Sequence, residues 1–139
     1  MSTWNDRLAK ALFNRPQDWT YTGVAIEHAQ RNGQCACGHC GLRFTFQLQD
    51  KVTKTTLWVG SQCIENFYSV MPATCAKVWK KAAELKKLAT LKSRAEKELK
   101  RWQDYDAQED WQIRNKRSSI EHFTRVLAQW NERAGITTV

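Results

Sequence analysis

The chain has 139 residues, 42% of them hydrophobic, a formal net charge of +8 and a sequence pI of about 9.4. This length indicates one small domain with an appendage, whose modest core a bound metal would help to stabilise. The sequence shows no signal-peptide pattern and no apolar run long enough to span a membrane. We therefore expect a soluble, cytoplasmic protein without a membrane partner.

The first predicted elements are a short helix and a strand. Thr3 and Asp6 fit a capping box, so a helix is expected from there to about Phe13. Pro16 prevents the helix from continuing. Residues 19–27 are rich in aromatic and β-branched side chains, which predicts a strand.

Four of the five cysteines have the spacing of a zinc site. Cys35, Cys37 and Cys40 fall within six residues, and Cys63 follows 23 positions after Cys40. In a reducing compartment, cysteines so close together favour a metal over disulfides. Gly38 lets the backbone turn tightly around the ion. The sequence therefore predicts one structural Zn²⁺ ion held by these four cysteines.

This ligand set has one alternative. His39 lies inside the cluster and could replace Cys40, because adjacent residues rarely bind the same ion. Cys75 is predicted to be a spare, buried thiol. A site of four thiolates is closed and has no acid or base partner, so we predict no catalytic residue, no enzyme activity and no small-molecule substrate. A nuclease built on a treble clef is the enzymatic alternative.

A β-hairpin is predicted after the cysteine cluster. Apolar and polar residues alternate over residues 42–49, a polar turn follows at 50–54, and residues 55–59 return as a second strand. Gly60 ends that strand, and a short helix is expected to begin near Cys63. The hairpin would bring Cys63 back to the cluster, and the positive end of the helix would favour a thiolate there. This order of elements is the layout of a treble clef.

The rest of the chain predicts two helices. Between Pro72 and Gly135 there is no other glycine or proline. Two apolar stripes, one from Leu85 to Trp102 and one from Ile120 to Trp130, are separated by the acidic residues of 104–110, where we expect a bend.

Ser118 and Ser119 mark a second possible break, and Lys92 interrupts the first stripe. The predicted fold class is therefore α+β: a small treble-clef-like zinc module (a β-hairpin plus a short helix) followed by an α-helical hairpin. Residues 1–71 form the zinc-binding module, and residues 72–139 form a basic helical arm.

The positive charge is concentrated in one segment of the arm. Between Lys77 and Arg101 there are ten basic and three acidic residues, a difference of +7. A solvated helix face is the plain interpretation, and contact with nucleic-acid phosphates is the functional one. Lysine outnumbers arginine eight to two, which favours non-specific contact. The candidate contact residues are Lys77, Lys80, Lys81, Lys86, Lys87, Lys92, Arg94, Lys97, Lys100 and Arg101.

Two tryptophans in the same segment have two possible roles. Trp79 and Trp102 could stack on bases, or they could pack in the core. Core packing is the more common role for tryptophans spread through a chain of this length.

Two short motifs carry a resemblance. Cys-Ala-Cys-Gly-His at 35–39 and Val-Gly-Ser-Gln-Cys-Ile at 59–64, on either side of a Phe-rich hairpin, resemble a family of small zinc-binding proteins of bacteriophages and bacteria. The likeness covers about residues 19–68 and is weaker in the basic tail. It implies a zinc module, while Cys40 departs from the minimal pattern of the family. It implies no function, because the family is largely uncharacterised.

These observations predict a small structural-zinc protein, of phage type, that binds nucleic acid non-specifically through a basic helix. The alternative is a protein-interaction module that inhibits or redirects a host enzyme or complex, which the acidic segment 104–110 favours. If a phage encodes the chain, the expected location is the cytoplasm of the host cell. Salt distinguishes the two hypotheses, because phosphate binding weakens steeply as salt rises.

Overall fold

The computed structural model describes residues 4–139 of a chain of mixed α/β structure, which forms two compact units. The first, here called the head, comprises Met1–Ala83 and Ile136–Val139, and its description begins at Trp4. The second, here called the arm, is Glu84–Gly135. The boundary between them lies inside a helix, 12 residues after the 71/72 boundary that the sequence predicts. Thr3, the predicted helix cap, lies outside the described residues.

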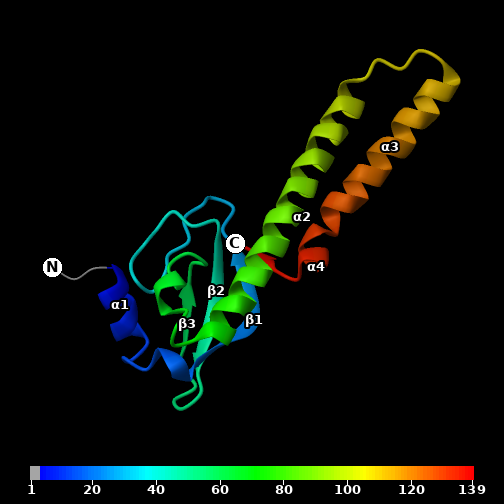
Figure 1. Ribbon diagram of the computed structural model, residues 1–139. Helices are drawn as coiled ribbons and strands as arrows, with labels where there is room; N and C mark the ends of the chain where they lie inside the picture. The colour runs from blue at the N-terminus through cyan, green and yellow to red at the C-terminus, as the bar shows by residue number, and fades with distance from the viewer. Residues whose placement is uncertain (1–3) are drawn as a thin grey trace. The chain divides into compact units, whose positions relative to one another are not determined.

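A four-stranded sheet forms the centre of the head, in the order β3-β2-β1-β4 (Figure 1). β1 pairs antiparallel with β2, β2 pairs antiparallel with β3, and β4 runs parallel to β1. The helical elements of the head are α1, two 3-10 turns (η1 and η2) and the first part of α2. Their bounds are α1 Trp4–Ala11, η1 Pro16–Asp18, β1 Trp19–Glu27, β2 Phe44–Asp50, β3 Thr56–Val59, η2 Glu65–Phe67, α2 Pro72–Asp104 and β4 Thr137–Thr138.

The predicted hairpin is present as β2 and β3, and its apolar alternation supplies much of the core. Phe46 and Leu48 are buried, and Phe46 pairs with Val59 across the hairpin. Trp19, at the start of β1, is also buried and donates a hydrogen bond from Nε1 to the carbonyl of Leu12 at 2.8 Å. The aromatic and aliphatic side chains of three strands therefore meet in one core.

Two polar side chains of β2 are buried: Thr45, on the face of the polar residues, and Asp50, on the face of Phe46 and Leu48. Thr45 is 2% exposed and hydrogen-bonds His28 Nε2 at 2.9 Å, while Asp50 is fully buried. Asp50 Oδ2 accepts hydrogen bonds from Arg15 Nη2 at 2.7 Å and from Thr53 Oγ1 at 2.8 Å. Burial raises the pKa of Asp50, but these bonds and the amides of Val52 and Thr53 outweigh it and hold the pKa below its usual range.

This carboxylate makes the stability of the head pH-dependent. Because the pKa of Asp50 is lower in the folded state than the value of about 3.9 for an unfolded chain, its contribution is complete above that value. The contribution is lost as the pH falls through the folded-state pKa. We expect Asp50→Asn to be less stable at pH 7 and to lose less stability than the parent between pH 5 and 2. Urea unfolding of the parent and the variant at each pH measures these stabilities. If the stability of the two proteins fell equally between pH 5 and 2, Asp50 would not be the source of the pH dependence.

Two predicted features of the chain differ in the structure. The segment after Gly60 forms turns and the short η2 where the sequence predicts an α-helix, so Cys63 does not lie at an α-helix N-terminus. The next α-helix begins only at Pro72. Ser118 and Ser119 lie inside a continuous helix, since packing of its apolar side stabilises the helix more than two serines weaken it.

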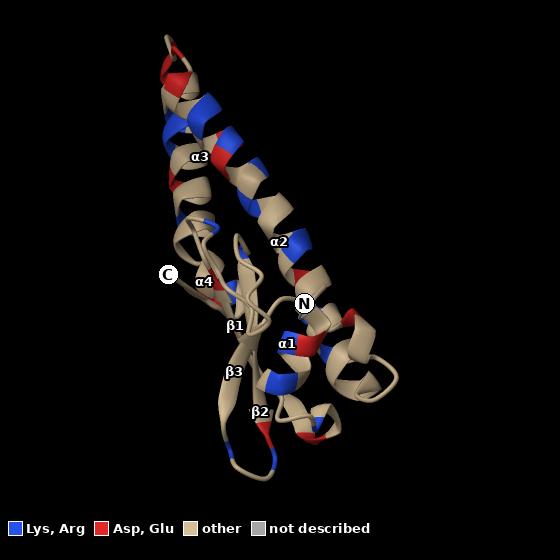
Figure 2. Ribbon diagram, turned by 90° about the vertical axis from the view of Figure 1, so that its left-hand side faces the viewer, with Lys and Arg blue, Asp and Glu red and all other residues tan. Residues whose placement is uncertain are grey.

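The arm contains the distal part of α2, followed by α3 (Asp110–Ala128) and α4 (Trp130–Ala134). Figures 1 and 2 show α3 antiparallel beside this part of α2, after a turn at the predicted acidic segment. A capping box between Glu109 and Gln112 starts α3. Gly135, with φ 65°, ends α4 in the left-handed region that glycine tolerates best.

Lys92, which interrupts the apolar stripe of α2, is accommodated by an aromatic ring. Its Nζ lies 4.3 Å from the ring centroid of Trp130, and Trp130 Nε1 donates to the carbonyl of Leu88 at 3.2 Å. The cation can stay near the core because the ring face attracts it. Within residues 4–139, no helix is both long and apolar enough to cross a membrane.

Candidate metal centre and basic helix

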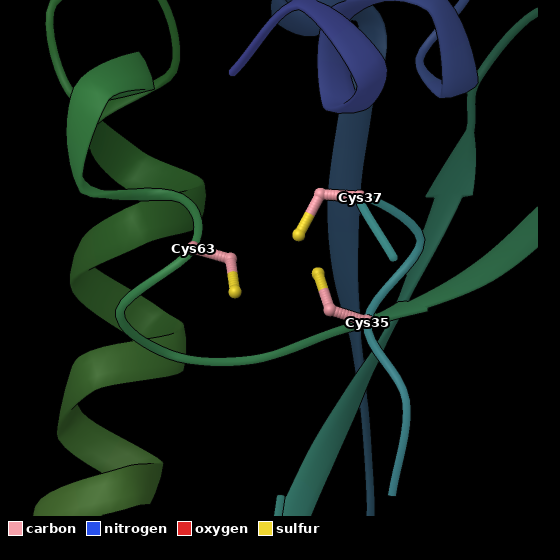
Figure 3. Close-up of side chains that lie close together, drawn as sticks. All are labelled: Cys35, Cys37 and Cys63. Atoms are coloured by element: carbon pink, nitrogen blue, oxygen red, sulfur yellow. The ribbon is translucent and has the colours of Figure 1, made fainter. Parts of the chain in front are cut away.

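Three thiol groups converge in the head. The Sγ atoms of Cys35, Cys37 and Cys63 all lie within 4.8 Å of one another, and Figure 3 shows the side chains pointing toward a common centre. Cys35 and Cys37 are 3% and 2% exposed, and Cys63 is half-buried. Two come from the loop before β2 and the third from the turn after β3. These three thiols are here called the cysteine triad, and they could hold a metal ion.

A tight turn places the first two thiols. The amide of Gly38 donates to the carbonyl of Cys35 at 2.8 Å, and the amide of Cys35 donates to the carbonyl of His39 at 2.8 Å. Gly38 has φ 96°, a backbone conformation that residues other than glycine rarely adopt. The amide of Ala36 also donates to the carbonyl of Trp58, which ties this turn to β3.

The pairing of β2 with β3 brings the third thiol back. Val59 pairs with Phe46, and Gly60 follows directly. A Cβ atom at Gly60 would lie 3.3 Å from Cys63 Sγ and 3.0 Å from Leu42 Cδ1, so the backbone passes very close to the triad. The hairpin thus brings Cys63 close in space to Cys37, although the two residues are far apart in the sequence.

The triad favours one negative charge. A hydrogen bond from Cys63 and the backbone amides of Cys37 and Gly60 lower the pKa of Cys35 to about 5, against the opposing effect of burial. The same bond and the charge on Cys35 raise the pKa of Cys63. Burial raises the pKa of Cys37. A bound cation would attract all three thiolates and reverse the last two shifts.

The structure brings together three of the four predicted ligands and leaves the fourth outside. Cys40 is exposed and does not belong to the triad. His39, the alternative ligand, is not part of it either; its ring lies edge-on to that of Trp4, with centroids 5.8 Å apart. Cys75 is fully buried, and its thiol lies 3.4 Å from the carbonyl oxygen of Ile64, so it is the spare thiol.

The close approach at Gly60 predicts a sensitive position. We expect Gly60→Ala to weaken metal affinity by about tenfold or more, because its Cβ would displace Cys63 Sγ and the amide that faces Cys35. Competition with a chromophoric chelator measures the affinity.

Gly23→Ala is the control for this substitution. It places alanine at φ 91° with nothing within 4 Å of the new Cβ, so it should lower stability while leaving metal affinity unchanged. Equal affinity in the Gly60 variant and the parent would show that the backbone at Gly60 does not position the triad.

The ten predicted basic residues all lie on α2, eight of them exposed. Lys81 and Lys92 are half-buried. Two of the exposed residues, Lys77 and Lys80, belong to the head; the other six belong to the arm. These six, here called the basic face residues, are Lys86, Lys87, Arg94, Lys97, Lys100 and Arg101.

The basic face residues occupy the side of α2 away from its buried positions. Lys87, Arg94 and Arg101 recur every seven residues, so they follow one side of the helix at about 10 Å intervals. The buried positions of the same segment are Leu85 and Ala95. Figure 2 shows basic bands along α2 with a few acidic bands between them, and further acidic bands at the turn that follows. Arg101 is partly neutralised by Glu98, 2.7 Å away.

The two predicted stacking residues already have partners within the chain. In the head, Trp79 stacks on Tyr68 with ring centroids 5.5 Å apart and donates to the carbonyl of Ser61. In the arm, Trp102 meets Tyr105 edge-on. Trp111, which was not among the predicted contact residues, is 56% exposed. Its position in the sequence, away from the apolar stripe of α3, is the signal that could have identified it as an exposed tryptophan.

Comparisons of this chain with models of protein families, with curated proteins and with solved structures found no match. The interpretation of the metal centre and of the basic helix therefore depends on their own geometry and charge.

Proposed function

We propose that the chain is a small zinc protein in which the metal secures the head and the basic face of α2 contacts nucleic-acid phosphates without sequence preference. The observation that carries the proposal is the convergence of three thiols from two segments that a hairpin brings together. The resemblance to small phage and bacterial zinc-binding proteins supports the same conclusion.

The choice of zinc follows from the donor set. Thiolates select Zn²⁺, Cu⁺ and iron–sulfur clusters among biological metals. Cys-rich knuckles that hold zinc use a tight turn with amides directed at the sulfurs. The turn at Cys35 and Cys37 is tight, since the amide of Gly38 donates to the carbonyl of Cys35 at 2.8 Å, and the amide of Cys37 in it and that of Gly60 after β3 lower the pKa of Cys35. The residues present therefore fit zinc, which would be held by Cys35, Cys37 and Cys63.

The nucleic-acid part of the proposal rests on charge. Six exposed basic side chains share one segment of α2, and exposed phosphate contacts are non-specific when they come mainly from lysine. Within this segment Arg101 is paired with Glu98 at 2.7 Å.

Two measurements test the proposal. Elemental analysis of protein purified without added metal should give about one zinc per chain. Binding to a generic DNA duplex should weaken by about 0.9 log units per log unit of salt for each phosphate neutralised. Folded protein without zinc contradicts the first part, and salt-independent binding contradicts the second.

A second candidate function is supported by exposed apolar side chains on the arm. Trp111 and Ile113 on α3 and Tyr105 before it are 56%, 42% and 39% exposed, beside the acidic segment 104–110. Exposed aromatic residues are typical of protein interfaces, and carboxylates repel phosphate. A pull-down from nuclease-treated bacterial lysate, with Trp111→Ala as control, tests this function. Proteins retained by the parent and lost by the variant would favour it.

A further inference from the structure

The triad contains fewer donors than zinc requires. Structural zinc sites are almost always four-coordinate, and sites with three protein ligands keep a fourth position for water or another molecule. Residues 1–3 are Met-Ser-Thr, so every histidine, cysteine, aspartate and glutamate lies among the described residues. Among these, three thiols form the group that could hold a metal.

Cys40 lies in the same loop as the first two thiols but outside the triad. On one side of it, the amide of Cys35 donates to the carbonyl of His39 at 2.8 Å. On the other side, Gly33 and Leu42 exchange two bonds of 2.9 and 3.0 Å that close the base of the loop. Cys40, between these two connections, is exposed and is not part of the group of sulfurs.

The remaining candidates inside the chain are engaged elsewhere. His39 is exposed, and its ring lies against Trp4. His28 hydrogen-bonds Thr45 through Nε2. Cys75 is fully buried beside the carbonyl of Ile64. None of these side chains is part of the group of sulfurs.

We propose that a metal ion held by the triad keeps one coordination position for a donor from outside the chain, and that this donor is a neutral nitrogen ligand such as imidazole. The inference rests on the proposed zinc site. In it, the chain supplies three of the four ligands, and the fourth position stays open to a donor from outside. Three thiolates already exceed the charge of Zn²⁺, so a fourth anionic donor would add unpaired charge beside two almost fully buried sulfurs. Cys63 is half-buried, whereas the other two residues of the triad are buried.

Cobalt substitution tests this proposal. Co²⁺ replaces zinc, and its visible bands and its sulfur-to-metal charge-transfer band report the number of thiolates bound. The parent and Cys40→Ser should be loaded with Co²⁺ under a phosphine reductant, since a thiol reductant would itself occupy an open position. Each is then titrated with imidazole, with sodium chloride at equal ionic strength as the control.

The expected result is a saturable shift of the visible bands with imidazole and no shift with chloride. Charge-transfer intensity should be equal in the parent and in Cys40→Ser, and both should respond to imidazole alike. Lower intensity in Cys40→Ser, or a parent spectrum that imidazole leaves unchanged, would overturn the proposal by showing a closed site. A failure of both proteins to bind Co²⁺ or Zn²⁺ would overturn the zinc site itself, and the inference with it.

Discussion

Cys63→Ser is expected to abolish zinc binding and to unfold most of the head. Structural zinc contributes about 10–16 kcal/mol in zinc-finger peptides, as much as the total stability of about 5–15 kcal/mol of a typical domain. Serine is a poor zinc ligand, and only two thiols of the triad would remain. Elemental analysis gives the zinc content, and thermal unfolding followed by tryptophan fluorescence gives the stability.

Cys75→Ser is the matched control, since it makes the same chemical change at a buried thiol outside the triad. The serine hydroxyl can donate to the carbonyl of Ile64 as the thiol does. It should therefore keep a full zinc content and a midpoint temperature close to that of the parent. If the Cys63 variant lost its zinc but melted at the parent's temperature, the metal would not support the fold.

Reversing the charge of Lys87, Arg94 and Lys97 to glutamate is expected to eliminate binding to a generic DNA duplex at physiological salt. These side chains are exposed on one side of α2 within the arm. At low salt, where residual binding is measurable, the salt slope should fall by up to about 2.7, or about 0.9 for each lost contact. Fluorescence anisotropy of a labelled duplex measures both effects.

A second triple variant controls for net charge. Changing Lys10, Arg31 and Lys51 to glutamate gives the same net charge, because three exposed basic residues are again reversed, but these lie in the head. If α2 forms the contact surface, this variant retains most of the affinity and the salt slope. Equal losses in the two variants would show that total charge alone determines binding, and unchanged binding in the first would make the basic face a solvated surface.

Local patterns were sufficient to predict much of the fold. The alternation around Phe46 and Leu48 predicted the hairpin, and the Gly- and Pro-free segment from Pro72 predicted the long helix. Each of these signals lies within a few residues of the element it specifies. The strand β4 carries no such signal: its two threonines are ordered by pairing with Ile26 and Glu27, far away in the sequence.

The candidate site was also predicted in large part from local patterns. Spacing identified Cys35, Cys37 and Cys63, because a knuckle and a hairpin are local structures. Spacing also selected Cys40, since C-x-x-C from Cys37 to Cys40 is as good a pattern as C-x-C from Cys35 to Cys37. The folded loop leaves Cys40 exposed and outside the group of three sulfurs, which spacing alone does not show.

The return of the chain to β1 makes the arm an insertion within the head. The carbonyl of Glu27 accepts a hydrogen bond from the amide of Val139, and its side chain accepts bonds from Thr138 and from Arg43. A truncation that removes the arm from the C-terminal side therefore also removes a strand of the head. Excision from within, by a short linker that joins residue 83 to residue 136, would spare that strand. It would also shorten the loop that must close before β4 can pair, which lowers the entropic cost of folding.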